Sequence, residues 1–267
     1  MHPFIYPFGI RIPSYGLLML TGLTVSFILL YFRSKKNELD TSSVTNLALF
    51  SIAGGLIGLF LFKPIINLPK VIINFDKYLS LGVEGAFTAI FGELVFYGGI
   101  IGGAIFCIIF CRTFKLPLLK SIDLLVPCIP IGHAIGRLGC FFGGCCYGAE
   151  VHADCFLAVI YPPYGIPGAA PPGIPLLPVP LIEAFFDIVI FVIILLLEKK
   201  IKTDGFNLIV YGILYSVLRF TLEFFRGDLV RGQFLGISTS QFVSIFFFAI
   251  CVFLLIKLLI KRKKTVL

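Results

Sequence analysis

The stretch PLIEAFFDIVIFVIILLL, residues 180–197, decides the fold class of this chain. Only Glu183 and Asp187 interrupt its apolar run, and its length approaches the roughly 20 residues that a helix needs to cross a bilayer. Six other segments have a similar length and composition: 14–32, 46–62, 90–111, 121–138, 206–224 and 239–260. The sequence therefore predicts an all-α integral membrane protein with about seven transmembrane helices.

The composition excludes a water-soluble fold and a nucleic-acid-binding function. Hydrophobic residues make up 58% of the chain and charged residues only 13%, with a mean hydropathy of +1.04. Soluble domains carry about 25% charged residues. The net charge of +8 comes from short basic clusters beside apolar runs, which indicates contact with anionic lipid headgroups. We therefore expect membrane lipids, and no nucleic acid, as partners.

The predicted span 121–138 differs from the others because it contains Asp123, Pro127, Pro130 and Arg137. Proline removes a backbone hydrogen bond from a helix, and charged side chains avoid lipid. We expect this span to be broken, or half-buried in protein.

Basic residues in alternate connections predict the orientation of the chain. They form four clusters: Arg33, Lys35 and Lys36; Arg112, Lys115 and Lys120; Lys199, Lys200 and Lys202; and Lys261, Arg262, Lys263 and Lys264. Short loops rich in Lys and Arg stay in the cytoplasm. This rule predicts an external N-terminus and a cytoplasmic C-terminus.

The same orientation predicts a long external loop over residues 138–179. Within 162–180, eight of nineteen residues are Pro, which excludes a regular helix and a central strand. No segment is long enough to fold alone, so we expect residues 1–267 to form a single polytopic membrane domain.

Glycines with small-xxx-small spacing occur in two of the predicted spans. They are Gly54 and Gly58 in one, and Gly98, Gly99, Gly102 and Gly103 in the other. This spacing lets helices approach closely, so helix packing is the favoured interpretation of most of these glycines, over contact with lipid.

Arg219, Glu223 and Arg226 lie on one face of the sixth predicted span, with Tyr211 and Tyr215 further along it. A central Arg costs about 2.5 to 3.5 kcal/mol on insertion scales, so its presence needs a reason. One reason is an ion pair that holds helices together. Two arginines and one glutamate leave a positive excess, however, and an anion such as a phospholipid phosphate fits that excess better.

His133 and Arg137 share one face of the fourth predicted span, and Glu183 and Asp187 share a face of the fifth. His133 has two interpretations, a hydrogen-bond partner between helices or a proton-transfer group. Glu183 opens its helix, where the helix dipole alone stabilises a carboxylate.

Cys140, Cys145, Cys146 and Cys155 lie close together on the predicted external side. A disulfide, structural free thiols, and a catalytic or metal-binding cluster are all open interpretations. Adjacent residues such as Cys145 and Cys146 seldom both bind one ion well, so we expect no metal site.

Five blocks of sequence, in order, resemble bacterial prolipoprotein diacylglyceryl transferase. They are PSYGLL (13–18), FYGGIIG (96–102), GRLG (136–139), PVPLIE (178–183) and RFTLEFFR (219–226). The resemblance covers nearly the whole chain. It implies a multi-pass enzyme of the bacterial cell membrane that moves the diacylglyceryl group of phosphatidylglycerol onto the lipobox cysteine of a preprolipoprotein signal peptide. A thioether forms and glycerol phosphate is released.

The resemblance also implies roles for individual residues. Arg137 and Arg219 match the family's essential arginines, which would stabilise the departing phosphate. The matching substrate-binding positions are Arg226, Glu183, Glu223, Tyr15, Gly98 and Gly99. A thiol of pKa about 8.5 needs only modest help to ionise at a positive site, so we expect no metal or organic cofactor.

Two departures from the family pattern leave alternatives open. Where better-known members read His-Gly-Gly, this chain has Tyr97 before its two glycines, so either Tyr97 or His133 is the candidate base. Cys140 and Cys145 occupy positions that are usually Asn and Glu. The alternatives are a paralogous lipid-to-thiol transferase with another acceptor, and a non-enzymatic lipid or anion transporter whose arginines select phosphate.

Overall fold

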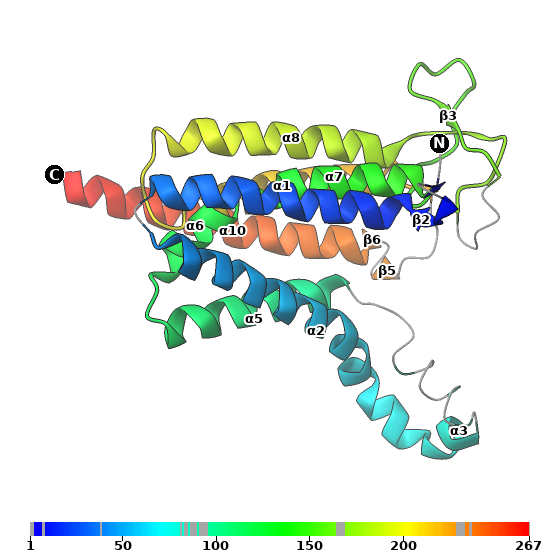
Figure 1. The fold of residues 1–267 in the computed structure, drawn as a ribbon, viewed down its shortest axis with the longest axis horizontal. Helices are drawn as coiled ribbons and strands as arrows, with labels where there is room; N and C mark the ends of the chain where they lie inside the picture. The colour runs from blue at the N-terminus through cyan, green and yellow to red at the C-terminus, as the bar shows by residue number, and fades with distance from the viewer. Residues whose placement is uncertain are drawn as a thin grey trace. The chain divides into compact units, whose positions relative to one another are not determined.

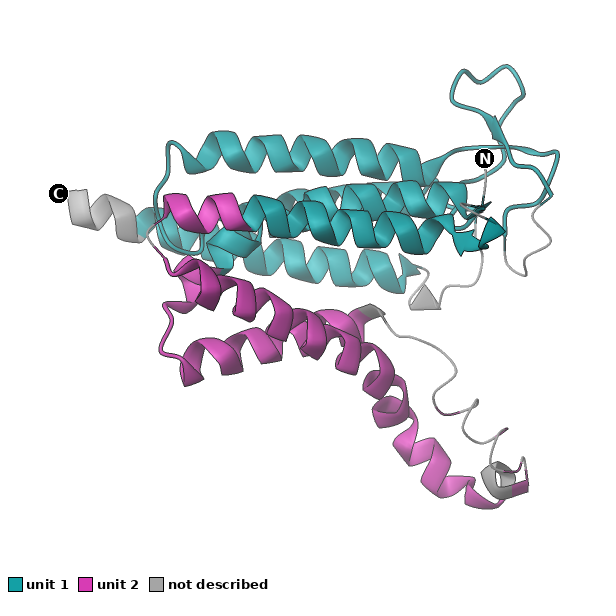
Figure 2. Cartoon of the chain, in the orientation of Figure 1, with its two compact units in different colours: residues 1–30, 122–267 teal, residues 31–121 magenta. Residues whose placement is uncertain are grey.

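The computed structural model describes residues 3–6, 9–37, 39–80, 82, 85, 90, 96–163, 169–227, 233–234 and 237–266. The chain divides into two compact units, which Figure 2 distinguishes by colour. Unit 1 comprises residues 1–30 and 122–267, and unit 2 comprises residues 31–121. The single membrane domain expected from the sequence stays a prediction.

Helices lie in all seven predicted spans (Figure 1); within the third span, 90–111, residues 91–95 lie outside the described part of the chain. Their bounds are α1 (Ser14–Lys36), α2 (Thr41–Ile73), α5 (Phe96–Thr113), α6 (Leu118–Leu125), α7 (Cys128–Phe142), α8 (Val179–Glu198), α9 (Phe206–Glu223) and α10 (Thr239–Val266); a short α3 spans Phe75–Ser80. Within the described residues, six spans are long and apolar enough to cross a membrane, with α6 and α7 taken as one, and α5 is a shorter apolar helix. The predicted all-α, multi-pass membrane fold is confirmed.

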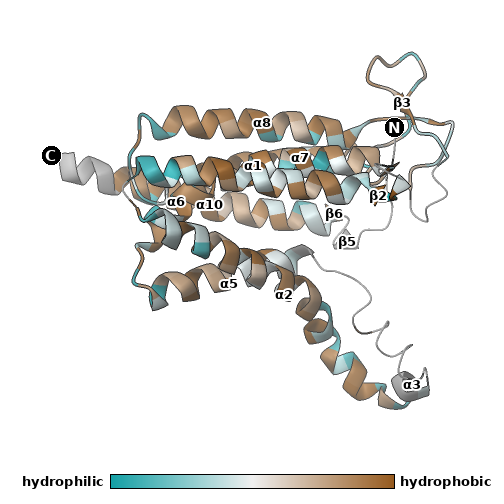
Figure 3. Ribbon diagram, viewed as in Figure 1, coloured by the Kyte–Doolittle hydropathy of each residue, from teal (hydrophilic) through white to brown (hydrophobic). Residues whose placement is uncertain are grey.

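Large apolar side chains cover the outward faces of these helices. Leu20 of α1, Phe185 of α8 and Phe253 of α10 are 64%, 62% and 65% exposed. Figure 3 shows the same apolar character along most of each helix. Exposed apolar surface of this extent fits the acyl chains of a bilayer and is rare on soluble monomers.

The fourth span is broken, as the sequence predicted. Helix α6 ends at Leu125, and α7 begins at Cys128 after Pro127. The charge in this span has a structural partner, because the carboxylate of Asp123 accepts hydrogen bonds from the backbone N–H groups of Gly205 (2.7 Å) and Leu208 (3.2 Å). These N–H groups belong to the first turn of α9, where a carboxylate satisfies donors that the helix leaves unpaired.

In unit 1, α7 packs on α8, and α9 packs on both α8 and α10. Helix α1 approaches α7 closely: Ser26 donates a hydrogen bond to the carbonyl of Cys128 at 2.9 Å. A Cβ added at Gly22 would lie only 2.8 Å from the carbonyl oxygen of Gly132. Small residues therefore allow this contact, as they commonly do between membrane helices.

The connection between α7 and α8 is fixed by backbone hydrogen bonds. Its described residues form no helix, and β3 (Val159–Ile160) pairs antiparallel with β4 (Pro175–Leu176). Gly148 N–H donates to the carbonyl of Leu177, and Ala149 N–H to that of Phe225, both at 2.8 Å. The connection runs over 143–178, shorter than the predicted 138–179, because α7 continues to Phe142.

Two further two-stranded sheets join β1 (Phe4–Ile5) to β2 (Ile12–Pro13), and β5 (Gln233–Phe234) to β6 (Ile237–Ser238).

In unit 2, α2 and α5 pack through the glycines singled out in the sequence. A Cβ added at Gly58 would collide with the carbonyl oxygen of Gly98, and one at Gly102 with that of Gly54. These glycines therefore serve helix packing, as predicted. Helix α2 is longer than its predicted span; it continues to Ile73 through Pro64 and Pro69, and bends in this half (Figure 1).

Candidate active site

Four ionisable side chains from α7 and α8 meet inside unit 1. Arg137 Nη2 donates to Glu183 Oε1 at 2.8 Å, and Arg137 Nε donates to His133 Nε2 at 3.1 Å. His133 Nδ1 lies 2.9 Å from Asp187 Oδ2. Because Nε2 of the imidazole accepts a hydrogen bond, the proton of a neutral His133 sits on Nδ1, facing the carboxylate. The four residues form one chain of polar contacts from Asp187 to Glu183.

Burial makes these contacts strong. Glu183 and Asp187 are both fully buried, at 0% exposure. A buried carboxylate is stable only when it is paired or hydrogen-bonded, and a guanidinium donor shorter than 3 Å is among the strongest partners. The i, i+4 spacing on each helix was visible in the sequence, but the meeting of the two faces was not.

A second ionic group lies on α9. Arg219 Nη2 contacts Glu223 Oε2 at 2.6 Å and also donates to Ser240 Oγ of α10 at 3.2 Å. Arg219 Nη1 is buried and has no hydrogen-bond partner among the described residues. A buried guanidinium N–H without a partner is costly, and an anionic oxygen would satisfy it.

Tyr215 connects the two ionic groups. Its ring lies edge-on to His133, with centroids 5.6 Å apart, and stacks on Tyr211 at 5.5 Å. Tyr215 lies within electrostatic range of both Arg137 and Arg219. Both arginines thus act electrostatically on the same phenol. The sequence placed Tyr215 along the face of Arg219, but it did not indicate the contact with His133. Ser240 was missed as well, because its only signal is a contact with another helix.

Tyr15 and Arg226 lie at the same end of unit 1. A Cβ added at Gly139 would lie 3.2 Å from Tyr15 Cδ2, so Tyr15 packs on α7 close to Arg137. Arg226 forms a β-bridge with Gly148, immediately after α9. The two predicted substrate-binding residues thus lie beside the arginine site.

Three of the four predicted cysteines cluster at the end of α7. The Sγ atoms of Cys140, Cys145 and Cys146 all lie within 4.8 Å of one another. Cys155 is not part of this group. All eight cysteines of the chain fall within its described part, and none is joined in a disulfide in this structure. The disulfide and free-thiol alternatives both stay predictions.

Three predicted site residues lie outside unit 1. Tyr97, Gly98 and Gly99 belong to unit 2, whereas the arginines belong to unit 1. Gly98 and Gly99 approach α2, where Cβ atoms added to them would contact Phe62 and Leu59. The catalytic role of Tyr97 and the substrate-binding roles of the two glycines stay predictions.

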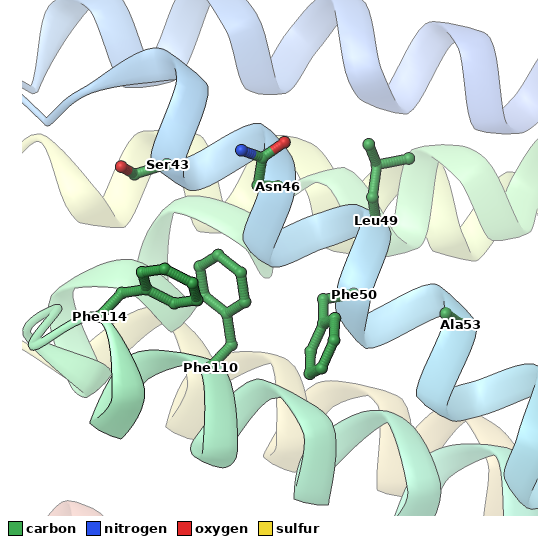
Figure 4. Close-up of a pocket in the computed structure, with 7 residues that line it drawn as sticks. All are labelled: Ser43, Asn46, Leu49, Phe50, Ala53, Phe110 and Phe114. Atoms are coloured by element: carbon green, nitrogen blue, oxygen red, sulfur yellow. The ribbon is translucent and has the colours of Figure 1, made fainter.

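A shallow hollow of about 450 Å³ lies between α2 and α5 in unit 2 (Figure 4). Its lining is Ser43, Asn46, Leu49, Phe50, Ala53, Phe110 and Phe114. It contains neither an ionisable side chain nor a predicted site residue, so we assign it no catalytic role.

Comparison with known proteins decides the family. The family model of prolipoprotein diacylglyceryl transferase matches residues 3–257. The chain belongs to the prolipoprotein diacylglyceryl transferase family. It is 34% identical over 246 residues to phosphatidylglycerol–prolipoprotein diacylglyceryl transferase of Clostridium tetani, covering 92% of this chain and 93% of that protein. The enzyme of that name from Clostridium novyi is 30% identical over 259 residues, covering 97% and 96%.

Membership of the prolipoprotein diacylglyceryl transferase family confirms the resemblance carried by the five sequence blocks. Four of these blocks (13–18, 136–139, 178–183 and 219–226) lie in unit 1, and the fifth (96–102) lies in unit 2.

Proposed function

We propose that this protein transfers the diacylglyceryl group of phosphatidylglycerol to the lipobox cysteine of prolipoproteins. The names of the relatives support this substrate pair. The observation that carries the proposal is the buried Arg219 Nη1, which has no hydrogen-bond partner among the described residues and lies in a helix of membrane-spanning length, with Arg137 fixed by Glu183 in the same unit. Two guanidinium groups at this depth match a phosphodiester that enters with its lipid tails in the bilayer.

We further propose a bacterial cell membrane location, with the N-terminus outside and the C-terminus in the cytoplasm. The Lys and Arg clusters in alternate connections support this orientation. It gives the arginine site, at the end of unit 1 next to Tyr15, access to the external side, where the signal peptide of a translocated prolipoprotein presents its cysteine.

In the proposed reaction, the acceptor thiolate attacks the glycerol carbon that bears the phosphodiester. A C–S bond forms, the C–O bond breaks, and glycerol phosphate departs with the electron pair. Arg219 Nη1 supplies a donor for the developing phosphate charge, and Arg137 is held in position by Glu183 and His133. The thiol proton leaves before or during attack.

The geometry bears on which group accepts that proton. One nitrogen of His133 accepts from Arg137 and the other faces Asp187. A proton on Nε2 would break the contact with Arg137, so His133 is better placed to orient Arg137 than to act as base. Tyr97 stays the other candidate base.

The direct test uses the purified protein in phosphatidylglycerol nanodiscs with a lipobox peptide. We expect a mass gain of one diacylglyceryl group on the peptide cysteine. The Clostridium tetani relative serves as the positive control, and a peptide with Cys→Ser as the negative control. Absence of the adduct, where the relative produces it, would overturn the proposal.

The paralogue alternative is favoured by one observation, the replacement of polar family positions by Cys140 and Cys145. The same assay with a small-molecule thiol and no lipobox peptide separates the two. An adduct on the small thiol, with none on the peptide, would replace the proposed acceptor. Family membership favours a transferase over the transporter alternative.

A further inference from the structure

The three-cysteine cluster is built by a reversal of the chain after α7. Gly144 has φ 69°, and the backbone N–H of Cys145 donates to the carbonyl of Cys140 at 3.0 Å. This turn folds the chain back over the last turn of α7, so that Cys145 lies next to a residue five positions earlier. The short connection after it is anchored at Gly148 by the bond to Leu177.

Cys146 adopts a conformation that places its thiol with the other two. Its φ of 60° lies in the left-handed region, which residues with a Cβ rarely occupy. Such outliers persist where the surrounding structure requires them, often at functional sites. Although adjacent cysteines seldom both bind one ion, the sulfur atoms of Cys145 and Cys146 lie within 4.8 Å of each other and of Cys140. The expectation that these residues form no metal site therefore does not follow from their adjacency.

The spacing of the sulfurs is close to that of a metal–thiolate site. Zn–S bonds of about 2.3 Å in a tetrahedral site place the sulfurs about 3.8 Å apart. The three Sγ atoms lie within 4.8 Å of one another, so a contraction of at most about 1 Å brings them to this spacing.

The charge around the cluster suits bound thiolates. Arg137 and Arg226 both lie within electrostatic range of Cys146. Three thiolates around a divalent ion carry a net charge of −1, which nearby guanidinium groups offset. Burial is uneven: Cys140 is buried, whereas Cys145 and Cys146 are partly exposed. One side of the cluster is therefore open.

We propose that Cys140, Cys145 and Cys146 bind one thiophilic divalent ion of the zinc class as thiolates, and that the fourth coordination position takes the acceptor thiol. Three protein ligands with an open fourth position are the pattern of catalytic zinc sites. Binding releases the thiol protons to water, and the coordinated acceptor thiol loses its own proton as well. The acceptor role rests on the proposed function, whereas ion binding does not.

This site gives a reason for both departures from the family pattern. A metal-bound thiol is already deprotonated, so a dedicated base is not needed. Cys140 and Cys145, which stand where the resemblance has Asn and Glu, are then two of the three ligands. The bound ion supplies the thiolate even though Tyr97 stands in place of the His base.

The first experiment measures ion binding by the reduced full-length protein in detergent, without lipid or peptide. Titration with Co²⁺ should give thiolate-to-cobalt charge-transfer absorption that saturates at one ion per chain and is displaced by Zn²⁺. Cys140→Ser, Cys145→Ser and Cys146→Ser should each weaken binding at least tenfold, whereas the matched control Cys155→Ser should bind as the wild type does. Absence of this absorption in the wild type, or its persistence in all three variants, would overturn the proposal.

A measurement on the wild type guards against variants that fail to fold. Zn²⁺ should slow alkylation of Cys145 and Cys146 at least tenfold and leave that of Cys155 unchanged. Equal alkylation with and without Zn²⁺ would overturn the site, as would air oxidation to a disulfide that saturating Zn²⁺ does not slow.

The second experiment tests the fourth position. Adding lipobox peptide to the Co²⁺-loaded protein should increase the charge-transfer intensity, and the peptide with Cys→Ser should not. An unchanged spectrum would overturn the acceptor role and leave a structural ion. Because this readout needs no lipid and no turnover, its failure is distinguishable from failure of the transferase assay.

Discussion

Arg137 and Glu183, 46 positions apart in the sequence, form a 2.8 Å ion pair between α7 and α8. The carboxylate is buried and the guanidinium nearly so, with side-chain exposures of 1% and 14%. The pair therefore holds two helices together and, at the same time, aims Arg137 at the candidate site.

Arg137→Ala should abolish transfer and also destabilise the protein. Removing one partner of a buried pair leaves the other uncompensated, at a cost of about 3–5 kcal/mol. The double variant Arg137→Ala/Glu183→Gln should regain part of the stability but none of the activity. Thermal unfolding in detergent and the peptide assay measure the two effects. Arg112→Ala, on an exposed residue at the end of α5, is the control for the loss of a cation.

Arg219→Ala should lower kcat about 10²–10³-fold, as removal of an oxyanion donor does in other enzymes. Ser240→Ala removes only one acceptor of Arg219 Nη2 and should change kcat less than about tenfold. The comparison uses initial rates at saturating phosphatidylglycerol. Activity of Arg219→Ala within a few fold of the wild type would remove its assigned role.

His133→Gln distinguishes a positioning role from a base. A Gln side-chain oxygen can accept from Arg137 Nε in place of His133 Nε2, but it does not titrate. We expect most of kcat to remain in His133→Gln and to be lost in His133→Ala. Loss of about 10²–10⁴-fold in His133→Gln as well, with loss of the acidic limb of the pH profile, would identify His133 as the base instead.

Gly58→Ala should destabilise the α2–α5 contact by about 1–3 kcal/mol, because its Cβ has no room against the carbonyl of Gly98. Gly16→Ala is the matched control, since nothing lies within 4 Å of the added Cβ and Ala is the better helix former. Their melting temperatures in detergent should therefore shift in opposite directions. A shared small shift would contradict the packing role.

Asp40 should make the start of α2 sensitive to acid. Hydrogen bonds from the side chain and backbone of Ser43 lower the pKa of the Asp40 carboxyl. A lowered pKa means that the stabilisation is present above the ordinary carboxyl pKa of about 4 and is lost as the pH falls through the folded value. The protection factor of the Ser42 and Ser43 amides, which is the observed exchange rate corrected for intrinsic exchange at each pH, should fall with acid in the wild type. In Asp40→Asn, which caps without titrating, the protection factor should not change with acid.

Hydropathy and charge were enough to place the seven spans, because lipid requires long apolar helices whatever their neighbours are. The break near Pro127 was predicted for the same reason. The faces of His133 with Arg137 and of Glu183 with Asp187 also followed from helical spacing. These features depend on residues within one turn or one span of each other.

What the sequence did not reveal depends on contacts between elements. Nothing local indicates that Glu183 is the partner of Arg137, that Ser240 reaches Arg219, or that Asp123 caps α9. The left-handed conformation of Cys146 was also hidden, since residues other than glycine seldom adopt it.

The backbone bonds of Gly148 and Ala149 restrict how a lipid can reach the arginines. They attach one segment to both Leu177, just before α8, and Phe225, just after α9. Parting these two helices at that end would break both hydrogen bonds. A phospholipid donor with its two acyl chains must therefore enter from another side of the bundle, where these bonds do not hold the helices together. After each reaction, the next phospholipid must enter by the same route.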